Sequence, residues 1–454
     1  MSRLDRWQEP EAATAAFASR GFASAADKAK QLTRAARRLA AAGVDGTREA
    51  HAFFVPGRIE VLGKHTDYCG GRSLVAATEQ GFCLVAVPRD DARVRVTDAA
   101  AREEATFDLD PELAPPRGHW SNYPMTVARR LARNFPDARR GVDLAFCSDL
   151  PAAAGMSSSS AFIIAAFLAL RAVNHLAEHP NYRRNIPDDL SLAEYLGTNE
   201  NGQSYRELQG DRGVGTFGGS EDHTGILCSE PGSLGQFAYC PTRFERRVAV
   251  PEGYVFAIGS SGVVAEKTGA ALERYNRVSA RAAALVDAWT SSTGREATTL
   301  AAIVEQGEEA IAELGAIVRR QPPAGFAEGE LQRRLDQFCL EHLKIVGQAG
   351  EALDRGDLGE FKRLVIRSQR AGADMLENQV EETVALATMA CDRYAEAASG
   401  FGAGFGGSVW ALVRAAEAPD FLEQWERDYR ARFPERGEAL FLTTGAGSSA
   451  FELA

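Results

Sequence analysis

The sequence predicts a mixed α+β fold divided into two or three domains. Its 454 residues exceed what one ordinary core accommodates, and an apolar fraction of 45% is enough to fill several interiors. The N-terminal half mixes strand-like and helix-like segments without the strict alternation of a doubly wound fold. No internal repeat or low-complexity linker interrupts the chain, so we expect the two halves to pack closely together.

The individual elements follow from hydrophobic periodicity, which differs between helices and strands. Residues 1–50 are rich in alanine and have helical spacing, whereas the next run is strand-like in spite of its Pro-Gly pair. The predicted strands lie at residues 50–63, 82–90, 93–99, 141–150, 246–261, 409–415 and 438–444. Further helices are predicted at residues 123–135 and 157–179, over most of 266–397, and between the last two strands.

Composition excludes several classes of function. The formal net charge of −11 argues against a nucleic-acid binder, because the phosphate backbone would be repelled. The N-terminus lacks the apolar segment of a signal peptide and no run of eighteen apolar residues occurs, so we expect a cytoplasmic protein with no membrane contact. We also expect a monomer. The seven scattered cysteines predict reduced thiols rather than disulfides or a metal site.

A run of small residues, "LPAAAGMSSSSAF" at 150–162, leads directly into a strongly apolar helix. Small side chains let backbone N–H groups approach an anion, and the N-terminus of a helix carries a partial positive charge, so this loop suits a phosphate. The simpler alternative is that Ser157 to Ser160 only cap the helix.

Two further loops are dense in glycine. "SGFGAGFGGSVWALV" at 399–413 precedes a strand, so it is not a dinucleotide-binding fingerprint, and its glycines indicate either a close approach to a ligand or a tight turn. "GTFGGSEDHTG" at 215–225 places Glu221, Asp222 and His223 behind two glycines. A carboxylate there is suited to act as a general base, although acidic residues in such turns are also common on surfaces.

Together with "PGRIEVLGKHTDYCGG" at 56–71, these loops resemble the motifs of the galactokinase branch of the GHMP kinases. The first motif of galactokinases reads P-G-R-V-N-L-I-G-E-H-T-D-Y-N-G-G, the second L-P-x-G-x-G-L-S-S-S-A and the third T-G-x-G-F-G-G. "HWSNYPMTV" is similar to the segment near the adenine, "GGSEDHTG" to G-x-M-D-Q, and "EKTGAALERYNRV" to the stretch ending in Y-N-E-R-R. The resemblance runs in order from about residue 50 to the last strand.

The resemblance implies an α+β, two-domain GHMP kinase fold with the active site in the inter-domain cleft. Residues 1–50 would form an N-terminal helical extension, 51–245 the N-terminal domain with the ATP and sugar motifs, and 246–454 the C-terminal domain. The reaction would be transfer of the γ-phosphoryl group of ATP, with Mg²⁺, to a sugar hydroxyl, in galactokinases the anomeric one.

The resemblance also assigns site residues. Asp222 matches the catalytic aspartate and Arg58 the arginine beside it, which keeps that aspartate ionised. The remaining assignments are His65, Asp67, Tyr275, Gly404 and position 64 for the sugar, Trp120, Tyr123, Gly155, Ser157, Ser158 and Ser159 for the nucleotide, and Ser158 with Glu200 for the metal. Glu207 and Asp211 compete with Glu200, because the segment before Asp222 is longer than the family pattern.

Lys64 departs from the pattern, which has a glutamate at this position that accepts a hydrogen bond from the 6-hydroxyl. A lysine has three donors and no acceptor. One hypothesis is that the enzyme takes a C6-altered or acidic sugar such as galacturonate. The other is that Lys64 turns away to pair with Glu60 or Glu221 and galactose is still used. A non-catalytic sugar sensor is the third alternative, and the presence of Arg58, Asp222 and the serine loop argues against it.

Overall fold

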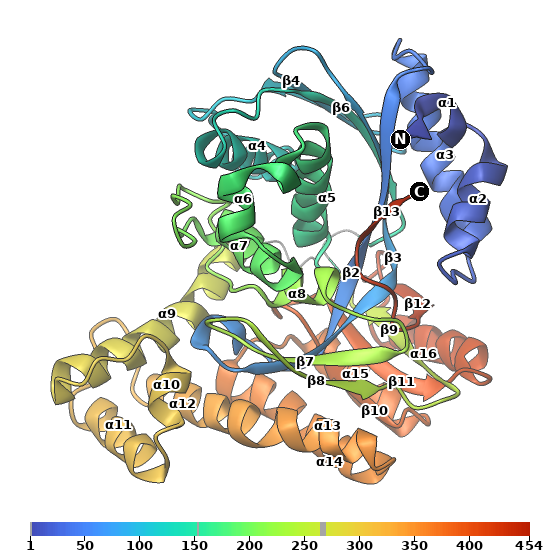
Figure 1. The fold of residues 1–454 in the computed structure, drawn as a ribbon. Helices are drawn as coiled ribbons and strands as arrows, with labels where there is room; N and C mark the ends of the chain where they lie inside the picture. Colours follow the sequence, from blue (N-terminus) through green and yellow to red (C-terminus); the bar gives the residue numbers. More distant parts are fainter. Residues whose placement is uncertain (1, 152–153, 264–268) are drawn as a thin grey trace.

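A computed structural model describes residues 2–151, 154–263 and 269–454, with the side chains of 269–272 left out, and contains two β-sheets covered by helices (Figure 1). The larger has nine strands in the order β1-β2-β3-β6-β4-β5, with β13 beside β2 and the β7–β8 pair beside β3. The smaller has the order β10-β11-β9-β12. The α+β fold predicted from the sequence is confirmed, because almost all strand pairs are antiparallel and the helices are not interleaved one by one.

The bounds of the elements are as follows. The strands are β1 Ser2–Arg3, β2 Glu49–Leu62, β3 Arg72–Pro88, β4 Arg93–Asp98, β5 Glu104–Asp108, β6 Val142–Ser148, β7 Ser233–Ala238, β8 Arg243–Ala249, β9 Tyr254–Ser260, β10 Ala397–Gly400, β11 Ser408–Arg414, β12 Leu440–Thr444 and β13 Phe451–Leu453. The helices are α1 Leu4–Trp7, α2 Pro10–Ala18, α3 Ala25–Ala41, α4 Asn122–Asn134, α5 Ser158–Val173, α6 Pro180–Asn185, α7 Asp189–Asn201, α8 Glu221–Leu227, α9 Gly269–Thr293, α10 Leu300–Val304, α11 Glu308–Arg320, α12 Glu330–Leu340, α13 Val346–Asp354, α14 Leu358–Ala371, α15 Glu381–Asp392 and α16 Ala418–Arg432.

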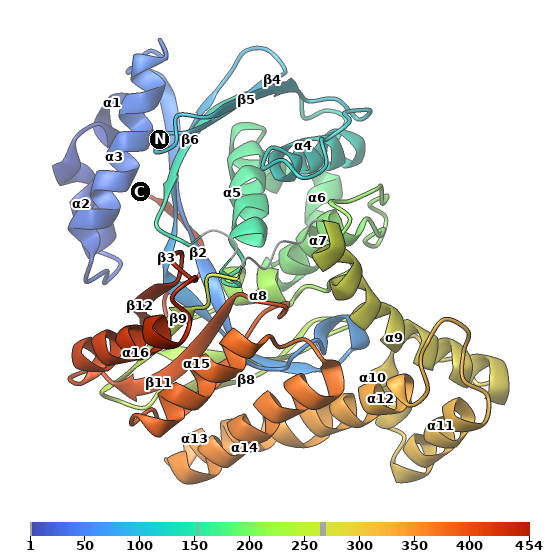
Figure 2. The same cartoon turned by 180° about the vertical axis from the view of Figure 1, so that it is seen from behind.

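The long strands β2 and β3 form the centre of the larger sheet and extend towards the second half of the molecule (Figures 1 and 2). Strand β3 begins at Arg72, although the sequence predicted a strand only from residue 82. The prediction was too short because the polar run Thr78 to Gln80 interrupts the apolar pattern. In the structure Thr78 is nevertheless buried, and Gly81 pairs closely with Pro56 of β2.

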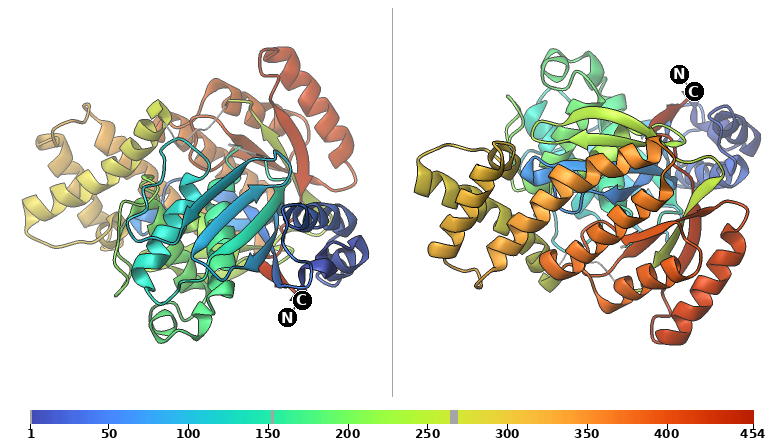
Figure 3. Two further views of the ribbon diagram at one scale, coloured as in Figure 1. Left: turned by 90° about the horizontal axis from the view of Figure 1, so that it is seen from above. Right: turned by 90° about the horizontal axis from the view of Figure 1, so that it is seen from below.

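Helices cover both faces of this sheet. The helices α1–α3 lie on one face, where Leu4, Trp7 and Phe17 pack with Phe54 of β2 and Val85 of β3. On the other face lie α4 and α5 (Figure 3, left). Because helices cover both faces, β2 and β3 are buried along nearly their whole length and do not alternate between buried and exposed residues.

Helix α5 is shorter than predicted. It ends at Val173, whereas the sequence predicted a helix to residue 179. The reason is a local cap: the Asn174 side chain donates to the carbonyl groups of Leu170 and Arg140, and His175 takes a left-handed conformation with φ of 50°. Side-chain hydrogen bonds of this kind compete with helix continuation.

The second half of the chain is mainly helical until it reaches the smaller sheet, as predicted. Helix α14 packs on one face of that sheet and α15–α16 cover the other (Figure 3, right). Helices α9–α12 share a separate core and form an arm at one end of the molecule (Figure 1). The chain then returns to the larger sheet, where β13 pairs with β2. The domain boundary at residues 245/246 stays a prediction. Among the described residues, no helix is long and apolar enough to cross a membrane.

An ion pair between a buried lysine and a partly exposed aspartate fastens α3 to the larger sheet. Lys28 is 2% exposed, and its Nζ lies 2.5 Å from Oδ2 of Asp149, which directly follows β6 and precedes the serine loop. The other carboxylate oxygen of Asp149 accepts a hydrogen bond from the backbone of Gly81. The N-terminal helices are therefore docked through a charged contact as well as an apolar face.

We expect Lys28→Met to lower the free energy of unfolding by about 1–2 kcal/mol, since Asp149 would lose its cation while its side chain stays 37% open to solvent. Urea unfolding followed by circular dichroism measures this. Lys30→Met on the same helix is the matched control, because the Lys30–Asp27 pair is exposed and its loss should change stability little. Equal effects of the two variants would contradict a docking role for Lys28.

Candidate active site

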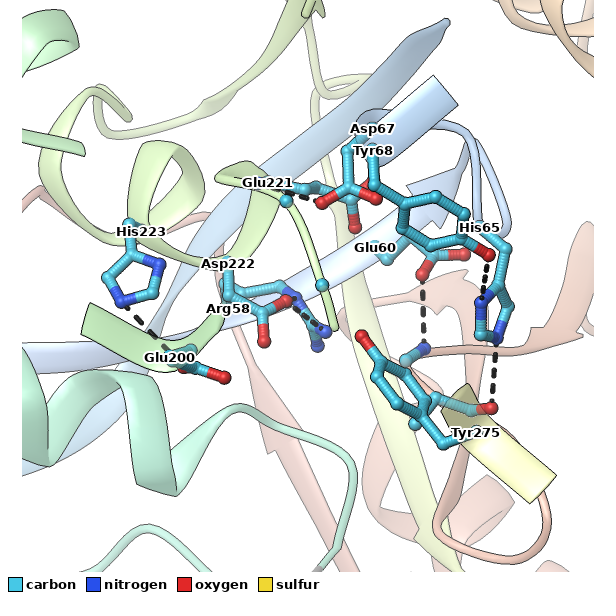
Figure 4. Close-up of a pocket in the computed structure, with 14 residues that line it drawn as sticks. Arg58, Glu60, His65, Asp67, Tyr68, Glu200, Glu221, Asp222, His223 and Tyr275 are labelled. Carbon is cyan, nitrogen blue, oxygen red and sulfur yellow. Dashed lines mark hydrogen bonds and ion pairs between the residues drawn. The ribbon is translucent and has the colours of Figure 1, made fainter. Parts of the chain in front are cut away.

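A pocket between the two sheets gathers the polar residues of several predicted motifs (Figure 4). Its walls come from β2 and the turn after it, from the loop that ends in α8, from the end of α7, from α9 and from the third glycine loop. The lining residues are Arg58, Glu60, His65, Asp67, Tyr68, Glu200, Gly218, Gly219, Glu221, Asp222, His223, Tyr275, Gly402 and Ala403.

Arg58 lies on β2 and binds two of the other motifs at once. Its Nε donates to Oδ1 of Asp222 at 2.8 Å, and its Nη2 lies 2.5 Å from the same oxygen. Its Nη1 donates to the carbonyl oxygen of Gly155 at 2.6 Å. Although burial of the guanidinium acts in the opposite direction, Asp222, Glu221 and Glu60 raise the pKa of Arg58 above its ordinary value, so it stays a cation.

Glycines make this close approach possible. A side chain at Gly57 would overlap the carbonyl of Met156, and one at Gly225 would press on Cβ of Arg58. Gly57 therefore lets the second motif lie against β2, and Gly225 lets α8 pack onto Arg58. This explains why the Pro-Gly-Arg sequence continues as a strand with a bulge between Pro56 and Arg58.

Asp222 occupies the first turn of α8 and belongs to a second cluster with Glu200, Ser160 and Thr216. The hydroxyl of Ser160 donates to Glu200 at 2.6 Å and lies 3.2 Å from Oδ2 of Asp222. The hydroxyl of Thr216 donates to the other oxygen of Glu200 at 2.9 Å. His223 lies 3.7 Å from Glu200. The aspartate thus has an arginine on one oxygen and a serine on the other.

The structure distinguishes the three acidic residues that competed for the metal. Glu200 lines the pocket. Glu207 is 60% exposed and pairs with Arg184, while Asp211 is buried in an ion pair with Arg129. The serine that reaches Glu200 is Ser160, whereas the sequence pointed to Ser158, the first residue of α5. Among the described residues, no group of three or more His, Cys, Asp and Glu side chains is arranged to hold a metal ion.

The serine loop enters α5 through Ser157, which has a left-handed φ of 57°. Its side chain makes no capping hydrogen bond within the described part of the chain, so the alternative that this serine only caps the helix is not supported. Gly155 also has a positive φ, and Ser158 and Ser159 follow in the first turn. Residues 152 and 153 of this loop lie outside the described residues.

The two aromatic residues predicted near the adenine, Trp120 and Tyr123, lie at the start of α4 and are both half-buried. The Trp120 ring is 6.0 Å from that of Phe162 in α5 and 6.4 Å from that of Phe146 in β6, centre to centre. They line the edge of the N-terminal core rather than the pocket that contains Asp222.

The residues assigned to the sugar separate into two groups. His65, Asp67 and Tyr275 line the pocket, but Lys64 and Gly404 do not. Gly404 has a positive φ, and a side chain there would overlap the backbone of Asn378, so its glycine is explained by packing.

His65 and Asp67 hold neighbouring loops in place. Nε2 of His65 lies 3.0 Å from the carbonyl oxygen of Ala403, which can only accept, so this nitrogen carries the proton. Nδ1 is 2.9 Å from the Tyr68 hydroxyl. Oδ2 of Asp67 accepts a hydrogen bond from the backbone of Glu221 at 3.3 Å. Burial raises the pKa of Asp67, and backbone hydrogen bonds act against that rise.

Lys64 points away from the pocket. It is 1% exposed, and its Nζ donates to the hydroxyl groups of Ser399 at 2.8 Å and Ser368 at 3.2 Å. Within the described residues, no carboxylate forms an ion pair with it, and this includes Glu60 and Glu221, its two predicted partners. Ser368 in turn donates to Glu341, which also binds the backbone N–H of Gly63. Lys64 is therefore part of a buried polar layer behind the pocket wall.

Glu60 is a pocket residue that sequence reasoning considered only as a partner for Lys64. It follows Arg58 by two positions on β2, so both side chains leave the same face of the strand. Burial raises the pKa of Glu60 to about 7, while Lys64 and Arg58 act in the opposite direction. The sequence could have indicated Glu60 as a pocket residue, because it lies two positions after Arg58 on the same predicted strand.

The pocket is strongly acidic. Its lining contains five carboxyl groups, those of Glu60, Asp67, Glu200, Glu221 and Asp222, against one guanidinium and two imidazoles. Burial, together with the charges of Glu60 and Asp67, raises the pKa of Glu221 well above its ordinary value. Such an environment favours hydroxyl donors and cations and repels an anionic sugar.

Comparisons with known proteins show which families and relatives the chain is similar to. Residues 44–88 match the model described as the galactokinase galactose-binding signature, and residues 122–201 match the N-terminal domain of GHMP kinases. The chain is 28% identical to a galactokinase of Chloroflexus aggregans over 90% of this chain and 94% of that protein. It is 27% identical to one of Actinobacillus pleuropneumoniae over 81% of this chain and 86% of that protein.

Among solved structures, the fold is similar to that of Lactococcus lactis galactokinase complexed with galactose. The TM-score is 0.75 at 23% sequence identity, with 91% of this chain and 98% of that chain covered. A mevalonate kinase from L. major gives a TM-score of 0.51 at 14% identity. These likenesses concern the fold.

The raised pKa of Glu60 predicts a pH dependence of stability. Because the folded-state pKa of about 7 exceeds the ordinary 4.5, the stabilising effect is complete below pH 4.5 and is lost as the pH rises through 7. The wild type should therefore lose free energy of unfolding between pH 5 and pH 8, and Glu60→Gln should not. The free energy of unfolding of the variant minus that of the wild type should rise over this range by on the order of 1–3 kcal/mol. Urea unfolding at the two pH values measures this.

Glu330→Gln supplies a matched buried control. Although burial acts in the opposite direction, hydrogen bonds from Arg277 and the backbone of Ala327 lower the pKa of Glu330 to about 2. Its difference from wild type should stay constant between pH 5 and pH 8. A Glu60→Gln difference that is equally constant would show that Glu60 does not titrate in this range.

Proposed function

We propose that this chain, a GHMP kinase of the galactokinase family, transfers the γ-phosphoryl group of ATP to the anomeric hydroxyl of galactose or a closely related neutral hexose. The observation that carries the proposal is the Arg58–Asp222 pair, which lies in an acidic pocket and is joined to the serine loop through Gly155. Phosphoryl transfer depends mainly on positioning and on neutralising charge, and this arrangement supplies both.

Asp222 acts on the sugar hydroxyl. It accepts the hydroxyl proton as the sugar oxygen forms its bond to the γ-phosphorus and the bond from that phosphorus to the β-phosphate oxygen breaks, which leaves a sugar phosphate and ADP. Arg58 keeps Asp222 ionised and adds positive charge beside the transferring group. Since the aspartate carries a hydrogen bond from Ser160 on its other oxygen, its carboxylate plane is fixed.

The serine loop is proposed to hold the phosphates. The positive φ angles at Gly155 and Ser157 turn the chain into α5, so the first turn of that helix presents its backbone N–H groups together with the hydroxyls of Ser158 and Ser159. Trp120 and Tyr123 are proposed to flank the adenine at the outer end of the same loop. Gly155 links this region to Arg58.

Glu200 is proposed to hold Mg²⁺ together with a serine of α5, and Ser160 is the serine that lies beside it. Carboxylate and hydroxyl oxygens are the ligand types that Mg²⁺ takes, usually with substrate phosphates completing the site. When bound, the ion neutralises charge on the phosphate oxygens. Thr216 fixes the second oxygen of Glu200 and so orients the carboxylate.

A neutral sugar is favoured over an acidic one. The hypothesis of a uronic acid substrate rested on Lys64, but the Lys64 ammonium is directed to Ser368 and Ser399 behind the pocket wall. A carboxylate on the sugar would instead face the acidic lining described above and would be repelled. His65, Asp67 and Tyr275 are proposed to line the sugar.

The first test measures ADP release from Mg-ATP with galactose, galacturonate, glucuronate, N-acetylgalactosamine, arabinose and fucose, with the product position read by phosphorus NMR. We expect galactose or another neutral hexose to exceed both uronic acids in kcat/KM by about a hundredfold or more, roughly 2.7 kcal/mol in transition-state binding, and to give a 1-phosphate. A uronic acid as the best substrate would overturn the proposal.

Asp222→Asn is the catalytic control for this assay. An amide cannot take up the hydroxyl proton, so kcat should fall by a factor of about 10²–10⁴ while the affinity for ATP, measured by calorimetry, stays nearly the same. Wild-type turnover in this variant would remove Asp222 from the mechanism.

We expect Glu200→Gln to raise the Mg²⁺ concentration needed for half-maximal activity by at least tenfold, because a carboxylate ligand is lost. Glu207→Gln is the matched control, since Glu207 is exposed and pairs with Arg184 on the surface. A magnesium titration of both variants measures this, and equal shifts would argue against Glu200 as the ligand.

A further inference from the structure

Glu60 has no role in the mechanism derived above, although it lines the same pocket. It is 3% exposed, and its Oε2 accepts a hydrogen bond from the backbone N–H of Gly402 at 3.2 Å. Its Oε1 is buried and has no hydrogen-bond partner within the described part of the chain. A buried carboxylate oxygen without a partner is unfavourable, so this atom is suited to a group that arrives with the substrate.

Two neighbours fix the direction of the Glu60 side chain. Gly402 holds one carboxylate oxygen, and Arg58 leaves the same face of β2 two residues earlier. Figure 4 shows Glu60 beyond Arg58 as seen from Asp222, on the side of the pocket where His65, Tyr68 and Tyr275 lie. The hydroxyl that reaches Glu60 is therefore a different one from the hydroxyl that faces Asp222.

Lys64 acts on Glu60 through its charge, from outside the pocket lining. Its charge lowers the proton affinity of the Glu60 carboxyl, while its own hydrogen bonds go to Ser368 and Ser399. The galactokinase motif written above has asparagine where this chain has Glu60 and glutamate where it has Lys64. This chain thus has its carboxylate at position 60, four residues before the glutamate of the motif, and a cation at position 64.

We propose that Glu60 is a specificity-determining residue of this kinase: its Oε1 accepts a hydrogen bond from a sugar hydroxyl other than the one phosphorylated, while Lys64 contributes only from the layer behind. The proposal rests on the proposed sugar kinase function. It also accounts for the neutral substrate class, because a carboxylate at this point binds a hydroxyl donor and repels an anionic group.

The alternative is that Glu60 only positions the third glycine loop through Gly402. The variant Glu60→Gln distinguishes the two roles. The amide oxygen of glutamine can still accept the hydrogen bond from Gly402, but the NH₂ group that then faces the sugar has no charge and donates instead of accepting. The substrates are galactose and its 2-, 3-, 4- and 6-deoxy derivatives, with kcat and KM measured for wild type and variant.

We expect Glu60→Gln to lower kcat/KM for galactose by about 10- to 100-fold, chiefly through KM, with the KM for ATP unchanged. For the one deoxy sugar that lacks the partner hydroxyl, the same substitution should change kcat/KM by less than about threefold. Glu382→Gln is a matched control with a buried glutamate that pairs with Arg436 and does not line the pocket, and it should leave the sugar profile unaltered.

An equal loss for galactose and all four deoxy sugars would overturn the proposal and assign Glu60 to loop positioning. Unchanged kinetics for every sugar would overturn it as well. A wild-type enzyme that phosphorylates none of these neutral sugars would instead contradict the proposed function, so the two failures are distinguishable.

Discussion

The site depends on one buried cation. The guanidinium of Arg58 is removed from water and therefore requires acceptors, and the structure supplies Asp222 from α8 and the Gly155 carbonyl from the serine loop. Because these partners come from segments more than 60 residues apart, the ion pair and its hydrogen bond determine where both segments lie. Gly57 and Gly225 are needed for the same reason, since any side chain there would separate the three elements.

Strand β2 is held in place by pairing and packing. Its partner β3 runs beside it over nearly its whole length, and helices cover both faces of the pair. In the second half of the strand lie Arg58 and Glu60, and His65 and Asp67 follow in the turn after it. These residues reach the second motif, the third glycine loop and α8 in turn. The residues of the first motif thus hold the other loops in position through hydrogen bonds and one ion pair.

The sequence was sufficient to predict the fold class, the loops that meet in the site and six of the fourteen residues that line the pocket, because glycine and serine density and charged residues within apolar strands are local signals. It was not sufficient for side-chain direction. Ser160 differs from Ser158 only in the face of α5 that it occupies, and Gly404 belongs to the packing against Asn378 although it lies in the same loop as Gly402. The direction of each side chain depends on contacts with distant segments. The early start of β3 at Arg72 also depends on distant segments, because its first residues pair with β2 and β7.

Lys64 shows why a single substitution is a poor guide to substrate charge. An ammonium group beside a sugar pocket suggests an anionic substrate, but that inference requires the cation to face the ligand. Here the Lys64 ammonium donates hydrogen bonds to Ser368 and Ser399, and Ser368 in turn donates to Glu341. The cation is therefore compensated inside the protein, and the charge that the substrate meets is set by the carboxyl groups of the lining. It follows that preference among sugars depends on the whole lining, in which one buried oxygen of Glu60 has no hydrogen-bond partner among the described residues.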